Sequence, residues 1–369
     1  MNLDTFIDHL AKHHWTDYEI KKYIGPYQGA YFGYSKDHMV RSNAASGGMA
    51  TAILIDMLSS GKIYGALVCM TRVENNSVRA GYAVATTRDE LISAQGSKYI
   101  SGKFSSEAMT LIRQFDGRLA VVALPCDAKL LHSVCAHNEA IRKKIALIIT
   151  LFCGHLSRPE LTDTVIKKIT HSADEELKSF RYRSGAWRGS LMLEMADGKV
   201  IRKRFSKFSN YQNLYYFCER KCLSCYDHIG FFGDVAVGDV WLQKMKSESI
   251  KHSCVIVKTD KGRRVVEDLL QGGKAALTSV PITTAMDAQT RSLRIHCNIS
   301  PRAAMAKKYG LRIDDPNPEK FNIFQRMVAK VILRNALLTQ TMAGAEKVRQ
   351  MSNLSLKTQL YFFKLLQLL

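Results

Sequence analysis

Three cysteines lie within eight residues of one another, at Cys218, Cys222 and Cys225. Thiolates bind iron–sulfur clusters and zinc, and a tight loop lets successive sulfurs reach one centre with little loss of chain entropy. Free cysteines prefer apolar core positions, whereas this segment is polar and carries three charged side chains between the first two thiols. The spacing therefore predicts a metal centre held by these three cysteines.

The elements before this segment alternate between strand and helix patterns. Compact apolar strands are predicted at Leu119–Leu124 and Ile145–Phe152, and each is followed by a helical pattern. This order favours a largely parallel sheet, whose ligands bind beyond the carboxyl ends of the strands. Cys126 and Cys153 both follow such strand ends.

Other patterns complete the expected fold. The apolar spacing within Ser42–Gly61 predicts a helix that begins at Ser46-Gly47-Gly48. Such a helix start leaves backbone amides free. Asp197-Gly198 between two strand-like runs predicts an antiparallel hairpin. We therefore expect an α/β fold of mixed type: a mixed sheet with flanking helices, an antiparallel hairpin and cysteine segment, and a C-terminal helical tail.

Composition narrows the functional classes. The 369 residues carry a formal charge of +20, which predicts an anionic partner. Lys and Arg are spread along the chain without a recognisable nucleic-acid module, so nucleic acid is not the expected partner. The nine scattered cysteines do not form a disulfide pattern and favour a reducing cytoplasm. No secretory signal is expected, because the N-terminus has neither a basic start nor a long apolar run, and the longest apolar run, Ile145–Cys153, is too short to cross a bilayer.

Several local motifs occur in an order typical of one family. They are Ser46-Gly47-Gly48, Gln95-Gly96-Ser97-Lys98-Tyr99, Pro125-Cys126, Phe152-Cys153-Gly154, Cys218-x3-Cys222-x2-Cys225 and Gly238-Asp239-Val240-Trp241. Over residues 30–275 this ordered set resembles the beta subunits of coenzyme F420-reducing hydrogenases and dehydrogenases. The resemblance implies an iron–sulfur flavoprotein oxidoreductase. It would pass electrons between a ferredoxin-type carrier, a 4Fe-4S cluster and a flavin to reduce an organic substrate.

The resemblance also implies a flavin pocket. Free amides at Gly47 and Gly48, together with Lys98, would hold the phosphates of the flavin. The implied flavin is FAD, with FMN as the alternative. The implied cofactor-binding residues are Ser46, Gly47, Gly48, Gly96, Ser97, Lys98 and Tyr99.

A cubane cluster normally takes four thiolates, and the cysteine segment supplies three. The resemblance favours Cys126 as the fourth ligand, because this family presents a cysteine to the active site at a Pro-Cys turn. Cys153 is the alternative fourth ligand. No residue is assigned a catalytic role.

Two departures from the family pattern shape the expected partners. No ferredoxin-like run of paired cysteines precedes residue 30, so a separate ferredoxin-like donor is expected to dock. The family's more usual Gly-Thr-Pro-Cys-Gln is replaced by Ala123-Leu124-Pro125-Cys126-Asp127. We therefore expect a substrate other than coenzyme F420, a small or sugar-derived molecule in polysaccharide or cell-envelope biosynthesis.

Five segments are expected along the chain. They are a helical lead-in (1–29), an α/β flavin-binding part (30–175), a catalytic part with the cysteine loop (176–280), a connecting segment (281–318) and a basic amphipathic tail of two helices (319–369). A basic amphipathic helix can lie on an anionic membrane, although packing on the parent domain is commoner. The sequence therefore predicts a cytoplasmic protein and leaves open peripheral contact at the inner membrane face through residues 320–369.

The cysteine spacing leaves two other functions open. Radical S-adenosylmethionine enzymes share it, although here the motif follows a long α/β region and Ser224 stands where those enzymes usually place an aromatic residue. The other is a zinc-stabilised, non-enzymatic binding protein in which His228 completes the three thiolates. Flavin together with iron and sulfide would favour the oxidoreductase over both.

Overall fold

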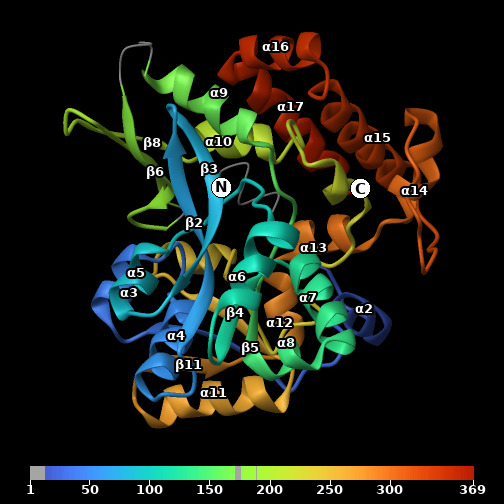
Figure 1. Ribbon diagram of the computed structural model, residues 1–369. Helices are drawn as coiled ribbons and strands as arrows, with labels where there is room; N and C mark the ends of the chain where they lie inside the picture. Colours follow the sequence, from blue (N-terminus) through green and yellow to red (C-terminus); the bar gives the residue numbers. More distant parts are fainter. Residues whose placement is uncertain (1–12, 171–175, 188) are drawn as a thin grey trace.

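The computed structural model describes residues 13–170, 176–187 and 189–369 (Figure 1). The main layer is a sheet built from strands β1 (Gly29–Ser35), β2 (Gly65–Glu74), β3 (Ser77–Ala85), β4 (Leu119–Ala123), β5 (Ile145–Leu151), β9 (Val235–Asp239), β10 (Ser253–Val257) and β11 (Ala275–Ser279). The strand order is β11-β1-β10-β9-β5-β4-β2-β3. Strands β2, β4, β5 and β9 are parallel neighbours, while the outer pairs are antiparallel. The expected mixed α/β fold is confirmed.

The parallel strands bring two of the predicted cysteines to one edge. Strands β4 and β5 pair in parallel up to Ala123 and Thr150. Helix α7 (Pro125–His137) begins just after β4, so Cys126 lies in its first turn. Cys153 follows the end of β5 by two residues. Because the carboxyl ends of parallel strands meet at one edge, both cysteines lie there, as the sequence predicted.

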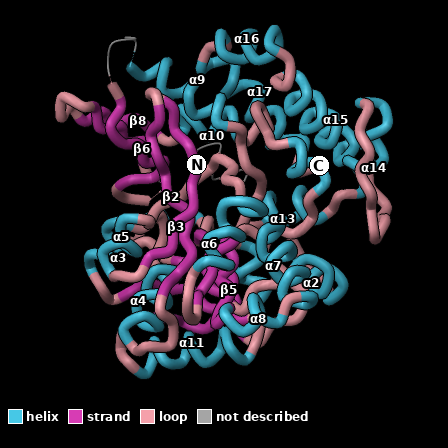
Figure 2. The backbone as a smooth tube through the Cα atoms, viewed as in Figure 1, coloured by secondary structure: helices cyan, strands magenta, loops and turns pink. Residues whose placement is uncertain are grey.

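Helices cover both faces of this sheet (Figures 1 and 2). One core lies under α4 (Met49–Ser59), α5 (Arg88–Ser93) and α11 (Asp260–Gln271). The opposite face packs against α2 (Asp17–Tyr23), α6 (Met109–Gln114), α7, α8 (Glu139–Lys144), α12 (Ile282–Asp287) and α13 (Thr290–Cys297). Val235 and Val237 of β9 are buried in the core on the first face, and Ala236 is buried in a core on the opposite face. This alternation is typical of a strand that is buried on both sides. Helix α3 (His38–Asn43) follows β1.

A second, smaller sheet carries the predicted hairpin. It contains β6 (Leu177–Ser184), β7 (Ser190–Met195) and β8 (Val200–Arg204) in that order, with every pair antiparallel. Strands β7 and β8 flank Asp197-Gly198, which confirms the hairpin. This sheet shares one hydrophobic core with α9 (Pro159–Thr170), α10 (Ser206–Gln212) and the C-terminal helices α14 (Ser300–Ala306), α15 (Ile323–Leu338), α16 (Met342–Gln350) and α17 (Asn353–Leu366).

The last fifty residues form three helices where the sequence predicted two. Thr341 and Ser352 interrupt the expected run, because their side chains accept hydrogen bonds from Gly344 N and Ser355 N and so begin α16 and α17. The apolar faces of these helices point into the shared core, where Leu333 and Phe363 are buried. Within the described ranges, no helix combines the length and the apolar character that a membrane span needs.

The predicted lead-in of residues 1–29 lies partly outside the described residues. Its described part forms α2, which begins at a capping box between Thr16 and Glu19. Short 3-10 or π turns lie at Phe104–Ala108, Arg220–Ser224, Gln243–Lys246 and Lys307–Tyr309.

Candidate functional site

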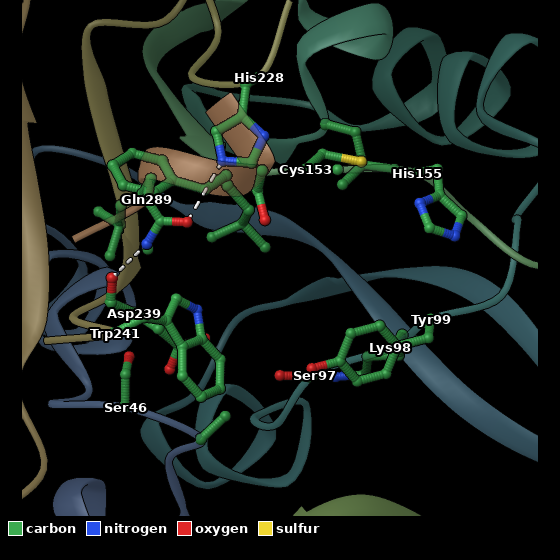
Figure 3. A pocket seen from close by; sticks show the side chains of 18 of the residues that line it. Ser46, Ser97, Lys98, Tyr99, Cys153, His155, His228, Asp239, Trp241 and Gln289 are labelled. Carbon is green, nitrogen blue, oxygen red and sulfur yellow. Dashed lines mark hydrogen bonds between the residues drawn. The ribbon is translucent and has the colours of Figure 1, made fainter. Parts of the chain in front are cut away.

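A cavity of about 860 Å³ lies where the main sheet meets the C-terminal helical part, a size typical of small-molecule sites. Its wall includes the ends of β4, β5 and β9 and residues from α10 and α17. Six of the seven residues predicted to bind the flavin line it (Figure 3): Ser46, Gly48, Gly96, Ser97, Lys98 and Tyr99. Gly47 instead packs behind the wall, where a Cβ atom would lie 2.3 Å from Gly33 O and 2.7 Å from Ser253 N.

The start of α4 presents backbone amides to this cavity. Gly48 has φ +79°, a left-handed conformation that suits glycine, and no side-chain hydrogen bond caps the helix there. The following residues Met49, Ala50 and Thr51 also line the cavity. Uncapped amides at a helix N-terminus, with the helix dipole behind them, suit a bound phosphate.

Three cations hold the chain that leads into α4. Arg181 Nη2 donates to Asn43 O at 3.1 Å, and Arg183 Nη2 donates to Ala45 O at 3.1 Å. Lys251 Nζ donates to Ala44 O in the same segment. The carbonyl groups of residues 43–45 are therefore turned toward fixed positive charges, which orients the segment and makes this end of the cavity cationic.

Asp239 supplies a carboxylate oxygen to the cavity. One oxygen, Oδ2, accepts from Arg183 Nη1 at 2.6 Å, and the Trp241 ring lies 5.0 Å from the same guanidinium. Burial lowers the pKa of Arg183, but the charges of Asp239 and Tyr99 and their hydrogen bonds together outweigh it, so the pKa is raised overall. The second oxygen, Oδ1, is buried and has no hydrogen-bond partner among the described residues. Asp239 lies beside Trp241 in the cavity wall (Figure 3).

Lys98 contributes a titratable charge to the same wall. Its Nζ donates to Ala94 O and, at 3.4 Å, to Gln95 O. Burial lowers the pKa of Lys98 to about 8; the Cys69 thiolate opposes this shift and Arg181 adds to it. The ammonium group is therefore charged at neutral pH and loses its proton as the pH rises through about 8.

We expect FMN affinity for flavin-free protein to fall as the pH rises through about 8, by up to tenfold per pH unit because one proton leaves. Titration calorimetry across this range measures the effect, with riboflavin as the control that lacks a phosphate. Lys98→Met should bind FMN more weakly and show a flat profile there. A pH step of the same size in Lys98→Met would contradict this role.

Five thiols gather beside the cavity. Cys218 and Cys222 are buried, and Leu156 N donates to Cys222 Sγ at 3.4 Å. Burial raises the pKa of Cys153 far above its usual value, and charge on Cys222, Cys225 and Cys126 would raise it further. Burial, Asp127 and the neighbouring thiols likewise raise the pKa of Cys126 to about 12. The structure therefore brings together every cysteine that the sequence nominated, and Cys153 also lines the cavity.

The donors are thiols, which as thiolates are the usual ligands of iron–sulfur clusters. Across the described part of the chain, no three His, Cys, Asp or Glu side chains are arranged around one metal position. His228, the predicted fourth zinc ligand, has Nε2 3.3 Å from Gln289 Oε1. All nine cysteines are free of disulfides and thus available as thiols.

Sequence reasoning missed several residues of this region. His296 Nε2 lies 3.3 Å from Cys225 Sγ, and Arg302 Nη2 donates to Cys225 O at 2.9 Å. Both belong to residues 281–318, which the sequence marked only as a connecting segment, and no local motif signals them. The cavity wall also includes Leu360, Phe363 and Lys364 of the C-terminal α17 and Gln367 just after it.

Two family models match the chain, and both describe the beta subunit of coenzyme F420 hydrogenase/dehydrogenase. The model of its N-terminal part matches residues 30–106, and the model of its C-terminal part matches residues 116–282. The chain belongs to this family. Coenzyme F420 hydrogenase/dehydrogenase beta subunits are oxidoreductases that bind iron–sulfur clusters, so the resemblance and the enzyme class inferred from the motifs are confirmed.

Individual relatives of this beta subunit family are distant. The chain is 26% identical over 212 residues to an uncharacterized protein of Methanocaldococcus jannaschii, a match that spans 55% of this chain and only 54% of that relative. It is 20% identical over 253 residues to coenzyme F420 hydrogenase subunit beta of Methanococcus voltae, covering 68% and 84% of the two chains.

A solved structure shows the same fold. It is a chain of the F420-reducing [NiFe] hydrogenase complex from Methanosarcina barkeri, with a TM-score of 0.60 and 17% identity. The match covers 79% of this chain and 97% of that one. At 17% identity the structural similarity is evidence for the fold alone.

Proposed function

We propose that this protein passes electrons from a ferredoxin-type carrier, through a 4Fe-4S cluster, to a flavin that reduces an organic substrate. The observation that carries the proposal is the place of Cys153, which lines the cavity and lies within electrostatic range of Cys126, Cys222 and Cys225. A flavin bound in the cavity would thus lie beside the cluster. A flavin exchanges single electrons with clusters and hydride with organic molecules, so the two groups together connect the two kinds of carrier.

The cluster ligands in this proposal are Cys218, Cys222, Cys225 and Cys126, with Cys153 as the alternative to Cys126. The thiol segment turns its sulfurs inward and holds them through backbone contacts, such as Leu156 N to Cys222 Sγ. The chain's part is to fix the thiol positions and to keep water away from Cys218 and Cys222, which are buried, while Cys126 is exposed.

The flavin site in this proposal uses the start of α4 and residues 96–99. The amides near Gly48 and the Lys98 ammonium would bind phosphate. FAD is the proposed flavin and FMN the alternative. Phe363 and Leu360 of α17 close one side of the cavity and exclude water from it.

The proposed substrate is a small or sugar-derived molecule of polysaccharide or cell-envelope biosynthesis. Hydroxyl and amide side chains collect where α10 and α17 line the cavity: Ser209, Gln212, Asn213 and Gln367. Such groups suit a substrate with many hydroxyls. Asp127, which replaces the family's more usual glutamine, is buried beside Cys126, and burial raises its pKa. A changed group at this point supports a substrate that differs from coenzyme F420.

A cationic face beside the cysteine loop supports a ferredoxin-like donor. Arg220 and Lys221 are exposed while Cys222 is buried, so the loop turns its charges outward and its thiols inward. A hollow of about 310 Å³ lies there, lined by Arg220, Lys221, Leu223, Ser224, Leu311, Arg312 and Ile313. Charges at this place would steer an acidic electron carrier toward the cluster.

Reversing two of these charges, Arg220→Glu with Arg312→Glu, is expected to slow association with a reduced acidic ferredoxin by about tenfold or more at low salt. Stopped-flow measurement of flavin reduction gives the rate, and the effect should shrink as salt screens the charges. Arg349→Glu on α16 is the matched control and should leave the rate unchanged. A salt-independent rate in the unaltered protein would contradict this docking face.

Peripheral contact with an anionic membrane is part of the proposal, as is a cytoplasmic location. Exposed apolar side chains on the C-terminal helices support the membrane contact: Met342, Leu354, Phe362, Leu365 and Leu369. Lys357 is exposed beside them. Sedimentation with vesicles should show binding to phosphatidylserine vesicles that Phe362→Ser weakens. Equal binding to neutral vesicles, or none to either, would contradict the membrane contact.

The test of the whole proposal is cofactor analysis of anaerobically purified protein. We expect bound flavin with about four irons and four sulfides per chain, as one cubane requires, and flavin reduction on addition of reduced ferredoxin. Iron without flavin, together with cleavage of S-adenosylmethionine, would instead support a radical enzyme. Zinc in colourless protein would support a binding protein. Either result would overturn the proposal.

A further inference from the structure

Arg302 is a fully buried charge with donors that lack a partner. It lies in α14 and is 2% exposed. Its Nη2 donates to Cys225 O at 2.9 Å and His296 O at 2.8 Å, which fixes the plane of the guanidinium. Its Nε and Nη1 have no hydrogen-bond partner among the described residues. Burying such a charge without an anion is unfavourable, so the arrangement calls for an anionic partner.

The thiol of Cys225 is a candidate for that anion. Arg302 Nη2 contacts the backbone of Cys225 and the backbone of His296, whose ring lies 3.3 Å from the Cys225 sulfur. Arg302 therefore lies beside one of the proposed cluster ligands. No ion pair joins Arg302 to a carboxylate in the described part of the chain.

The contacts of Arg302 also hold it next to one ligand. Cys225 is fixed at its carbonyl by Arg302 and approached at its sulfur by His296 Nε2, 3.3 Å away. His296 lies in α13 and Arg302 in α14, beyond the region that the family models match. This part of the chain therefore forms one side of the thiol group.

We propose that Arg302 is the counter-charge of the iron–sulfur centre and raises its reduction potential. The inference rests on the proposed function, because it needs a cluster on these thiols. A cluster with thiolate ligands is anionic and gains one more negative charge when it is reduced. A fixed positive charge and hydrogen-bond donors beside the sulfurs favour the reduced form. Arg302 thus acts through the cluster ligands as a positioning and tuning residue.

The test compares Arg302→Gln, which removes the charge, with Arg302→Lys, which keeps it. Anaerobic redox titration followed by electron paramagnetic resonance gives the midpoint potential of the cluster. We expect Arg302→Gln to lower it by at least about 59 mV, a tenfold change in the ratio of reduced to oxidised cluster. The midpoint potential of Arg302→Lys should lie between that of Arg302→Gln and that of the unaltered protein. Arg326→Gln is the matched control, since Arg326 is exposed on α15, and it should leave the potential unchanged.

Each outcome decides the question. An Arg302→Gln protein that keeps its cluster at the original potential would overturn the inference and leave the proposed function standing. If Arg302→Gln loses its iron, the Arg302→Lys protein decides the question. A cluster retained in Arg302→Lys supports the role as counter-charge. Loss of iron from both variants, with an equal loss of thermal stability, shows a purely structural role and overturns the inference. Absence of iron from the unaltered protein would overturn the proposed function itself.

Discussion

The Cys222→Ala protein is expected to lose its iron–sulfur centre and keep its flavin. Cys222 is buried within the thiol group, and a hydrogen bond from Cys218 lowers the pKa of its thiol although burial opposes this. It is therefore the thiol of this pair that ionises first, and the cluster cannot be held without it. Iron should fall from about four atoms per chain to near zero. Flavin reduction by reduced ferredoxin should fall to the uncatalysed background.

Controls separate the metal centre from the fold. Cys135→Ala removes a half-buried thiol of α7 that is not among the nominated ligands, and it should keep iron, flavin and activity. Comparing Cys126→Ala with Cys153→Ala identifies the fourth ligand, because only loss of the true ligand should remove iron. Full iron content in Cys222→Ala would sink the assignment of the cluster to this segment.

Much of the thiol group follows from local rules. The apolar runs before Cys126 and Cys153 are recognisable strands, and parallel neighbours bring their carboxyl ends together. The spacing of Cys218, Cys222 and Cys225 adds three more thiols within one turn-like segment. A rule of sheet topology was therefore enough to predict that Cys126 and Cys153 lie at one edge of the sheet, whereas the choice of Cys126 as the fourth ligand came from the family resemblance.

The rest of the site depends on contacts between distant segments. Arg302 lies beside Cys225 only because α14 packs there, and helix packing leaves no trace in the residues around Arg302. Helix α17 has apolar residues on its outer face as well as its inner face, so its periodicity favoured a surface tail. Its place in the cavity wall follows from the shared core, which sequence patterns cannot assign.

Sheet order was also beyond local reasoning. Strand β1 lies between β10 and β11, which follow it by more than two hundred residues. Those long-range pairings place Ser253 of β10 beside Ser46, where the two hydroxyls lie 2.9 Å apart. They also place Asp239 of β9 under Arg183 of β6. The end of the cavity beside α4 is thus assembled from four separate stretches of sequence.

Arg183 holds these stretches together, and its removal is expected to have the second large effect. Its side chain is 1% exposed and pairs with Asp239, which is 20% exposed. It also donates to Ala45 O and lies against the Trp241 ring. Breaking a buried pair from one side leaves a charge without its partner, which costs about 3–5 kcal/mol.

We therefore expect Arg183→Met to lower the free energy of unfolding by about 3 kcal/mol, the lower end of that range because Asp239 keeps some contact with water. Flavin binding should weaken as well, since residues 44–46 lose an anchor. Urea unfolding and flavin titration measure the two effects. Adding Asp239→Asn should recover part of the lost stability, because the unpaired charge is gone. Arg202→Met, an exposed arginine of β8, should change stability by less than about 0.5 kcal/mol. An Arg183→Met protein as stable as Arg202→Met would show that the ion pair does not hold this end of the cavity together.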